Sequence, residues 1–280
     1  MKRLLDIEFH KFRYSKSSIV LTIIYLLIIS IAMLVGIIPF RFGPIEGSIA
    51  DLGIFNFPLV WHISTYCLSF LKILIAIVIV SLTANEYSNR TIKQNLIDGM
   101  SKKEMILSKF YLAFVLAFLT TVVVFIASLI LGLIYSDFDE PSIIFSQMGY
   151  LGAFFLAHLV FFCFCLFAGI LVKRSAFAIG FVIIWWIFEV ILNGIAFVID
   201  KTYGTEIYNW LIHILPLNAM SNLIKEPGSK VDLVQSSLNQ LTFDGIEFTY
   251  DIEWIDVASV CIWSTLFIYM SYALLKRRDL

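Results

Sequence analysis

The chain has 280 residues, 60% of them hydrophobic and only 15% charged, and its net charge is −1. Soluble domains are about half apolar and about a quarter charged, so this composition excludes an ordinary soluble protein and predicts one that crosses a membrane several times. The net charge says nothing about partners, because the side on which each charge lies matters more in a membrane protein than the sum. Four cysteines fall inside apolar stretches and are interpreted as small core residues rather than as a disulfide framework: Cys67, Cys163, Cys165 and Cys261.

Residues 1–18 combine apolar and basic side chains at helical spacing and predict a helix that lies in the membrane interface. A secretory signal peptide is the alternative. The apolar run that follows, residues 19–40, is longer than the hydrophobic region of a signal peptide, and no small-residue cleavage site comes after it. We therefore expect this run to be retained as the first membrane span.

Six apolar runs are long enough to cross a hydrocarbon core about 30 Å thick at about 1.5 Å per residue. An even number of spans places both ends of the chain on one side. That side collects fifteen of the twenty Lys and Arg residues, the other side has four, and Lys72 lies within a span. Cytoplasmic loops are enriched in basic residues, so both ends are predicted to be cytoplasmic. The predicted spans are residues 19–40, 59–83, 105–135, 145–172, 176–199 and 255–275.

The segment 84–104 is polar and charged, and it connects two strongly apolar runs. Within it Ile92, Leu96 and Ile97 recur on one side of a helix, and Gly99 follows where the chain would leave that helix. The pattern predicts a short amphipathic helix at the membrane surface, with the three apolar side chains holding it to the bundle.

Residues 86–91 read Glu-Tyr-x-x-x-Thr, and the chain continues with Leu96, Gly99, Ser101, Lys102 and Lys109. This pattern resembles the first cytoplasmic loop of ABC-2-type transporter permeases. Residues 275–280, which read LKRRDL, are similar to the usual ending of that family. The resemblance in hydropathy covers the whole chain.

The resemblance implies an all-α membrane protein that forms a single transmembrane domain over residues 1–280. Its parts would be six transmembrane helices, the N-terminal interfacial helix of residues 1–18, a cytoplasmic coupling helix within 84–104, and external half-helices between spans five and six. ATP and magnesium would bind a separate ATP-binding subunit, and this chain would hold no cofactor. The other partners implied are a second permease copy or a homologous permease, and the lipid bilayer; no nucleic acid is expected.

The same resemblance assigns segment 84–104 to coupling with the ATP-binding subunit. The alternative stays open that it is only a solvated loop that follows the positive-inside rule. The residues assigned to coupling are Glu86, Arg90, Thr91, Lys93, Leu96, Gly99, Ser101 and Lys102.

Residues 200–254 are the largest segment predicted to lie outside the membrane. Residues 208–225 are apolar but too short to span, and Pro216 interrupts them, so they predict two half-helices. In the family this position holds an external gate, which the half-helices resemble. Residues 240–251 place Asp244-Gly245 between two short β-prone runs and predict a hairpin, whose role stays open.

Motifs that would indicate an enzyme are absent from the sequence. It has no G-x-x-x-x-G-K-[ST] phosphate loop, no H-E-x-x-H, no G-x-S-x-G and no C-x-x-C. We therefore expect no catalytic residues and ATP hydrolysis on a partner. His158, Cys163 and Cys165 could suit copper or zinc, but their spacing spreads them around one predicted helix, so we expect no metal site.

Two charges lie inside the predicted spans, Lys72 in the second and Glu189 in the fifth. A charge at mid-bilayer costs about 2.5–3.5 kcal/mol on insertion scales, so each needs a partner or a wet cavity. Their depths in the membrane match, which predicts a contact between them beside the transport pathway. The alternative is that Lys72 bonds backbone carbonyls or water while Glu189 is protonated.

The sequence thus predicts the permease subunit of an ATP-driven ABC-2-type exporter in the plasma (bacterial inner) membrane. One alternative is a membrane-embedded structural or sensor subunit that recruits a cytosolic partner and moves no substrate. A secondary transporter is a third possibility, which internal repeats would favour; none is visible between the two halves of the chain. The substrate, and the choice between a homodimer and a heterodimer of permeases, stay open.

Overall fold

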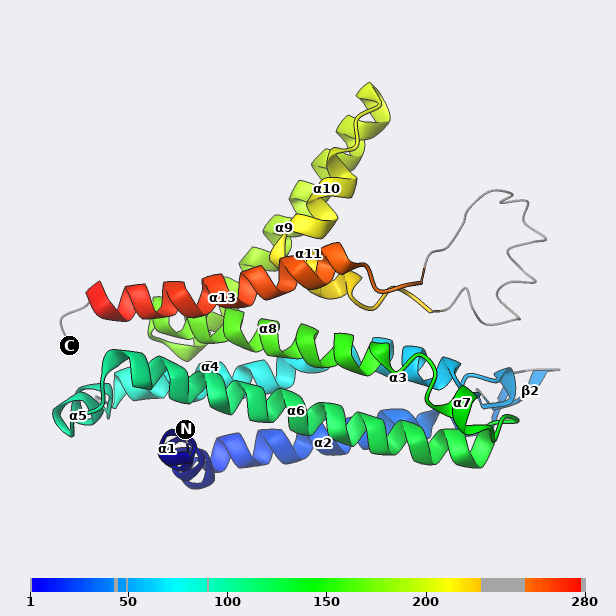
Figure 1. Cartoon of the computed structure of the whole chain (residues 1–280), viewed down its shortest axis with the longest axis horizontal. Coiled ribbons are helices and arrows are strands. Elements are labelled where there is room, and N and C mark those ends of the chain that lie inside the picture. Colours follow the sequence, from blue (N-terminus) through cyan, green and yellow to red (C-terminus); the bar gives the residue numbers. More distant parts are fainter. Residues whose placement is uncertain (1, 43–44, 49, 90, 228–249, 278–280) are drawn as a thin grey trace.

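The chain is predominantly helical, as expected for an all-α membrane protein. The computed structural model describes residues 2–42, 45–48, 50–89, 91–227 and 250–277. Its long helices lie side by side in a bundle, from which α9 and α10 project (Figure 1). The helices are α1 (Lys2–Tyr14), α2 (Lys16–Val35), the short 3-10 helix η1 (Ala50–Leu52), α3 (Leu59–Ser69), α4 (Lys72–Ser88), α5 (Thr91–Ile97), α6 (Lys102–Tyr135), α7 (Pro141–Ile144), α8 (Gly149–Val172), α9 (Ser175–Tyr203), α10 (Ile207–Ile214), α11 (Pro216–Asn222) and α13 (Trp254–Arg277).

Among the described residues, five helical segments are long and apolar enough to cross a membrane, and the bent pair α3–α4 would make a sixth span. All six lie close to the runs predicted from the sequence. The fourth of them joins the short α7 to α8 as Pro141–Val172. Long apolar runs therefore locate the spans well, whereas they do not show where a span is bent.

The second predicted span is broken into α3 and α4, which meet at an angle of 46°. The backbone bond that crosses the break runs from the Leu71 N–H to the Leu68 carbonyl, three residues back rather than four. The Ser69 hydroxyl donates to the Tyr66 carbonyl at 2.7 Å, a local bond that competes with the regular helical pattern. As a result Lys72 stands directly after the break, as the first residue of α4.

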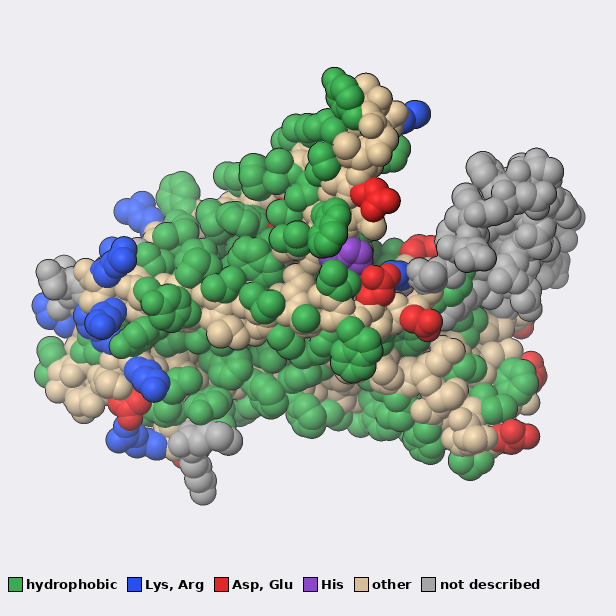
Figure 2. All heavy atoms as spheres, turned by 45° about the horizontal axis from the view of Figure 1, so that its top comes forward, with side chains coloured by type: hydrophobic (Ala, Val, Ile, Leu, Met, Phe, Trp, Pro, Cys, Tyr) green, Lys and Arg blue, Asp and Glu red, His purple; other side chains and the backbone are tan. Residues whose placement is uncertain are grey.

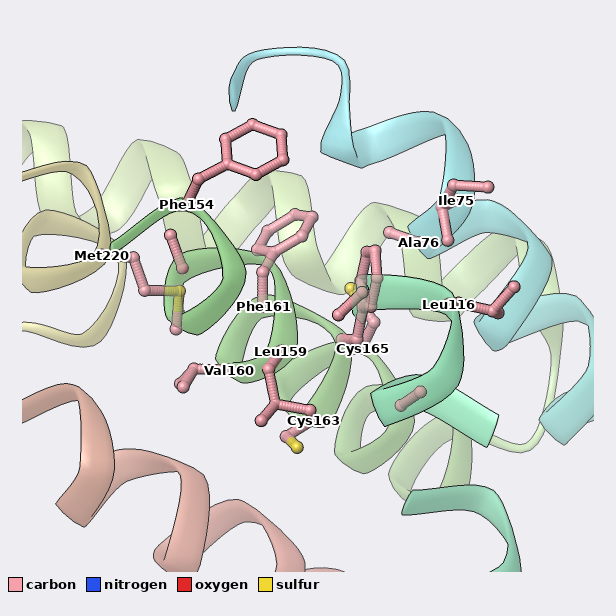
Figure 3. Packing of buried hydrophobic residues seen from close by; sticks show 14 of the residues in the cluster. Ile75, Ala76, Leu116, Phe154, Leu159, Val160, Phe161, Cys163, Cys165 and Met220 are labelled. Atoms are coloured by element: carbon pink, nitrogen blue, oxygen red, sulfur yellow. The ribbon is translucent and has the colours of Figure 1, made fainter. Parts of the chain in front are cut away.

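Helix α8 occupies the centre of the bundle. A helix that is apolar on every side either lies among other helices or faces lipid, and α8 is of the first kind, because most of its residues are buried. Figure 3 shows its side chains packed among residues of α4, α6 and α11. The residues drawn there from α8 include Phe154, Leu159, Val160, Phe161, Cys163 and Cys165, and those from the neighbouring helices include Ile75, Ala76, Leu116 and Met220.

The cysteines divide into two groups. Cys163 and Cys165 are fully buried in α8, as expected of small core residues. Cys67 in α3 and Cys261 in α13 are exposed, so the interpretation as core residues was wrong for these two. Both lie on apolar helices whose outer faces would meet lipid, where an apolar side chain is stable without protein neighbours.

The two ends of the bundle differ in composition. Helix α1, helix α5 and the end of α13 lie at one end, and α7 and the strands β1 (Phe40–Phe42) and β2 (Ile45–Gly47) lie at the other (Figure 1). The strands form a small antiparallel ribbon that we did not expect, with Phe40 opposite Gly47. Figure 2 shows Lys and Arg side chains gathered at the α5 end and Asp and Glu side chains toward the other.

The first part of α9 packs against α4 and α8, and its remaining part projects from the bundle together with α10 (Figure 1). Within α9 only four side chains are buried. The chain breaks between α10 and α11, and Pro216 is the first residue of α11, as predicted for two half-helices. The predicted hairpin at 240–251 falls almost entirely outside the described residues.

Candidate coupling site at the basic end of the bundle

Helix α5 connects α4 to α6 at the basic end of the bundle, inside the segment predicted to couple. Ile92 is buried and Leu96 packs against the core, so both hold α5 to the bundle as predicted. Ile97 is 70% exposed, so its predicted anchoring role was wrong. A helix of only seven residues has a narrow buried stripe, and position 97 has turned past its edge.

The end of α5 is closed by a glycine in the left-handed region. Gly99 has a φ of +91°, as the sequence predicted. Its N–H donates to the Leu96 carbonyl at 3.2 Å, and the Met100 N–H donates to the Asn95 carbonyl at 3.0 Å. These two bonds form a Schellman motif, which uses a residue with positive φ to satisfy the last carbonyls of a helix.

Helix α6 begins immediately afterwards with a capping box. The Glu104 N–H donates to the Ser101 hydroxyl at 3.2 Å, and the Ser101 N–H donates to the Glu104 carboxylate at 2.9 Å. Glu104 also pairs with Arg3 of α1 at 2.8 Å. Ser101, assigned to coupling from the resemblance, therefore fixes the position at which α6 starts.

The basic residues of this segment differ in exposure. Lys93 and Lys103 are exposed, whereas Lys102 is half-buried and its ammonium donates to the Lys276 carbonyl at 3.3 Å. Arg90 lies outside the described residues. The Thr91 hydroxyl donates to the Glu86 carbonyl at 3.3 Å, and this bond links the start of α5 to the end of α4.

Behind α5, four charged side chains meet in a network that we call the buried charge network: Glu8 and Lys11 of α1, Glu86 of α4 and Lys109 of α6. The Lys109 ammonium lies 2.7 Å from one Glu86 oxygen and 3.7 Å from Glu8. The Lys11 ammonium lies 2.9 Å from Glu86 and 3.0 Å from Glu8. The two negative carboxylates and the two positive ammonium groups give the network a net charge of zero. Their contacts join helices α1, α4 and α6.

Burial and pairing act in opposite directions on the carboxylate of Glu8. Burial raises its pKa, but the charges of Lys109 and Lys11 and hydrogen bonds from Lys11 and Ser108 outweigh burial and hold the pKa below its ordinary value of 4.5. The Ser108 hydroxyl donates to Glu8 at 3.0 Å. Charges removed from water are stable only when they are paired and hydrogen-bonded, so the network fixes how α1 sits against α4 and α6.

The sequence pattern includes Glu86 and Lys109 but gives them no partners, and it assigns Lys11 only to the basic face of the N-terminal helix and no role to Glu8. A signal was present, because Glu8 is an acidic residue on a largely basic helix, three positions before Lys11. Nothing in the spacing shows that these two side chains meet residues far along the chain.

The predicted contact between Lys72 and Glu189 is not formed, and no ion pair joins them among the described residues. Glu189 instead accepts hydrogen bonds from the Leu217 N–H at 3.2 Å, the Asn218 N–H at 3.0 Å and the Trp185 indole at 2.7 Å. The Lys72 ammonium lies 5.2 Å from the centre of the Phe161 ring. Matching depth is not enough, because the two side chains project in different directions from their helices.

Glu189 therefore binds the first turn of α11, where backbone N–H groups are otherwise unsatisfied. Pro216, the residue predicted for the external gate, sits at the start of that turn and is buried. The Asn218 side chain adds a bond to Asn193 of α9 at 3.0 Å. The half-helix α11 is thus attached to α9.

At the end of the molecule away from α5, a second charged cluster attaches the half-helices to α13. His213 lies 2.7 Å from buried Asp256, and Lys225 pairs with Glu253 at 2.5 Å. The hydrogen bond from Lys225 lowers the pKa of Glu253. His213, Glu253 and Asp256 are close enough together to hold a metal ion, but the Lys225 ammonium already neutralises Glu253 and His213 is already bonded to Asp256.

The apolar helices and their two polar ends define a multi-pass membrane protein. The profile of the ABC-2 family transporter proteins matches residues 55–275, and the chain belongs to this family. The match includes α5 and confirms the resemblance found around Glu86. No curated protein matches the chain. Membership supports an ABC transporter permease, a class that is embedded in the membrane and pairs with an ATP-binding subunit.

Proposed function

We propose that the chain is the permease subunit of an ATP-driven ABC-2-type exporter, which forms the translocation pathway together with a second copy or a homologous permease. The observation that carries the proposal is the buried charge network, which joins α1, α4 and α6 behind α5. An ATP-binding subunit that pressed on α5 would act directly on helices α4 and α6. ATP and magnesium would belong to that subunit.

In this proposal the bent pair α3–α4 counts as one span, giving six. Both ends of the chain and α5 face the cytoplasm of a bacterium, whose plasma membrane holds the bundle. The gathering of Lys and Arg at the α5 end supports this orientation (Figure 2). Helix α1, with its apolar and basic faces, would lie in the cytoplasmic interface.

The coupling surface would consist of the exposed Lys93 and Lys103 and of the polar side of α5. Ile92 and Leu96 anchor α5 from the other side. The Schellman motif and the capping box leave only a short link between α5 and α6. A movement of α5 would therefore move the start of α6 as well, because the link is too short to absorb it. The charge network would carry the same displacement to α1.

The test is the ATPase activity of the ATP-binding subunit reconstituted with this chain in lipid nanodiscs. We expect the permease to stimulate hydrolysis, and Lys109→Met to reduce the stimulation severalfold. Lys201→Met, an exposed lysine in the last turn of α9, is the matched control and should stimulate as wild type does. Stimulation that is unchanged by Lys109→Met would contradict the coupling role.

The second candidate function is a structural or sensor subunit that recruits the ATP-binding protein and transports nothing. Co-purification does not separate the two functions, since both bind the partner. An ATPase rate that rises with a candidate substrate, and accumulation of that substrate inside inverted vesicles, would favour the exporter. If the chain forms a stable complex with the ATP-binding protein but ATP hydrolysis responds to no candidate substrate, the structural subunit is favoured.

A further inference from the structure

A cavity of about 760 Å³ opens beside the break between α3 and α4 and extends to α8, α9 and α11. Its volume lies within the range of about 300–1,000 Å³ that is common for small-molecule sites. We infer that this cavity binds one amphipathic anion, with its apolar body against the aromatic walls and its anionic group on Lys72.

The walls of the cavity are mostly apolar. Tyr66 comes from the end of α3, Phe70 from the break, Phe161 from α8 and Trp186 from α9, and aliphatic side chains complete the walls between them. Apolar and aromatic walls bind the apolar part of a ligand through the hydrophobic effect and leave orientation to a few polar groups. The cavity therefore suits an alkyl or aromatic body.

Lys72 is the cation beside the apolar walls of the cavity, whose lining also includes Lys225 and Glu226. Its ammonium lies over the Phe161 ring, and among the described residues it has neither an ion pair nor a hydrogen bond. Lys72 is also the first residue of α4, where the helix dipole is positive. An intramembrane cation normally has a counter-charge or water, and an anionic group would satisfy both the ammonium and the helix terminus.

Most of the other polar groups of the lining have partners within the protein, and the lining also includes the Tyr66 hydroxyl and the Glu226 carboxylate. The Ser69 and Ser221 hydroxyls donate to carbonyls of their own helices at 2.7 and 3.0 Å. The Asn222 amide donates to the Ile212 carbonyl at 2.9 Å, and Lys225 at the rim pairs with Glu253. Preference for an anion would therefore rest on the Lys72 ammonium, and the anionic group would bind at Lys72 rather than near Glu226.

The cavity opens sideways rather than only toward one end of the bundle. Phe70 is 65% exposed and Trp186 is 56% exposed, and both lie on surfaces that lipid would cover. An amphipathic anion can reach such a site from the plane of the bilayer, either as a membrane lipid or as a free acid dissolved in it. The idea that the bound anion is the transported substrate rests on the proposed function. Binding of the anion to the cavity does not depend on that function.

The experiment is native mass spectrometry of the full-length chain, purified alone in a non-ionic detergent, with hexadecanoic acid or hexadecanol added at equal concentration. A charge-assisted hydrogen bond predicts that wild type binds the acid about tenfold more strongly than the alcohol. Lys72→Met should bind both probes equally, and Lys72→Arg should retain the preference. The control variant Lys201→Met should behave as wild type.

Ser221→Phe, which fills the cavity from α11 and keeps Lys72, should reduce binding of both probes. Displacement of the acid by phosphatidylglycerol would identify a lipid headgroup as an occupant, and failure to displace it would identify a free acid. Equal binding of acid and alcohol to wild type, or full binding of the acid to Lys72→Met or to Ser221→Phe, would overturn the inference. Because no ATP-binding subunit is present, such a failure would leave the proposed function untouched.

Discussion

Lys109 of α6 and Glu86 of α4 lie 2.7 Å apart, and both side chains are almost completely buried. Glu86 lies in the last turn of α4 and Lys109 lies within α6, so the charge pair joins the two helices that α5 connects. A buried ion pair adds little net stability compared with apolar packing, but removal of one partner is costly. Its clearest effect is to fix the relative position of the helices that carry it.

Lys109→Met should destabilise the protein by about 3–5 kcal/mol, because it leaves Glu86 and Glu8 to share Lys11 as their remaining ammonium partner in the buried charge network. The measurement is the midpoint of unfolding in sodium dodecyl sulfate. Lys103→Met, at an exposed position, should change stability by about 0.5 kcal/mol or less.

The double variant Glu86→Gln/Lys109→Met should be more stable than Lys109→Met alone, because it removes one charge of each sign and leaves the pair of Glu8 and Lys11 intact. Losses that simply add would show that the two buried groups do not interact.

The network should also respond to pH through Glu8. Its pKa in the folded protein lies below the ordinary value of 4.5, so the stability contributed by its ionised form is complete above that pH and is lost as the pH falls through the lower, folded value. We expect the difference in unfolding midpoint between wild type and Glu8→Gln to be constant near neutral pH and to disappear in acid. The exposed Glu206→Gln serves as control, and a difference that persists at the lowest pH would refute the pairing.

Gly99→Val should weaken the end of α5 by about 1–2 kcal/mol, because a φ of +91° is strained for a β-branched residue. Among the described residues, no atom beyond the adjacent residues lies within 4 Å of a Cβ added at Gly99, so the effect comes mainly from the backbone. Gly99→Asn, which tolerates a positive φ, should cost less. We expect ATPase stimulation to fall in the valine variant while the bundle remains folded; unchanged stimulation would show that α5 is not the transmission element.

Glu189→Gln should loosen the half-helix α11, since an amide presents one acceptor oxygen to three N–H donors. Hydrogen exchange should accelerate at the amides of Leu217 and Asn218. Lys72→Met should leave their exchange unchanged, and the two substitutions should be additive in a double-mutant cycle. Strong coupling between the two substitutions would instead support the direct contact between Lys72 and Glu189 that the sequence predicts.

The proposed orientation predicts which positions an impermeant thiol reagent can reach in intact cells. On a background without the four native cysteines, Asp139→Cys should be labelled from outside and Ser101→Cys should not. Both positions are exposed and lie at opposite ends of the bundle. Labelling in the reverse pattern would invert the topology and remove α5 from the cytoplasm.

The sequence predicts the spans, α5 and its glycine terminus because each follows from a local pattern. Ile92 and Gly99, for example, act through neighbours a few residues away. The break before Lys72 was missed because no Pro or Gly marks it. The pairing of Lys72 with Glu189 was wrong because depth along a helix does not specify the direction of a side chain, and the partners of Glu8 were missed because they lie in distant helices.

The separation of these partners along the chain also bears on biogenesis. Lys11 pairs with Glu86, 75 residues away, and Glu8 bonds Ser108, 100 residues away. Helix α1 is therefore synthesised before Glu86, Ser108 and Lys109, so only the pair of Glu8 and Lys11 can form until α6 has been made. In the proposed topology of six spans, the complete network can close only after α2 and the bent pair α3–α4 have crossed the membrane.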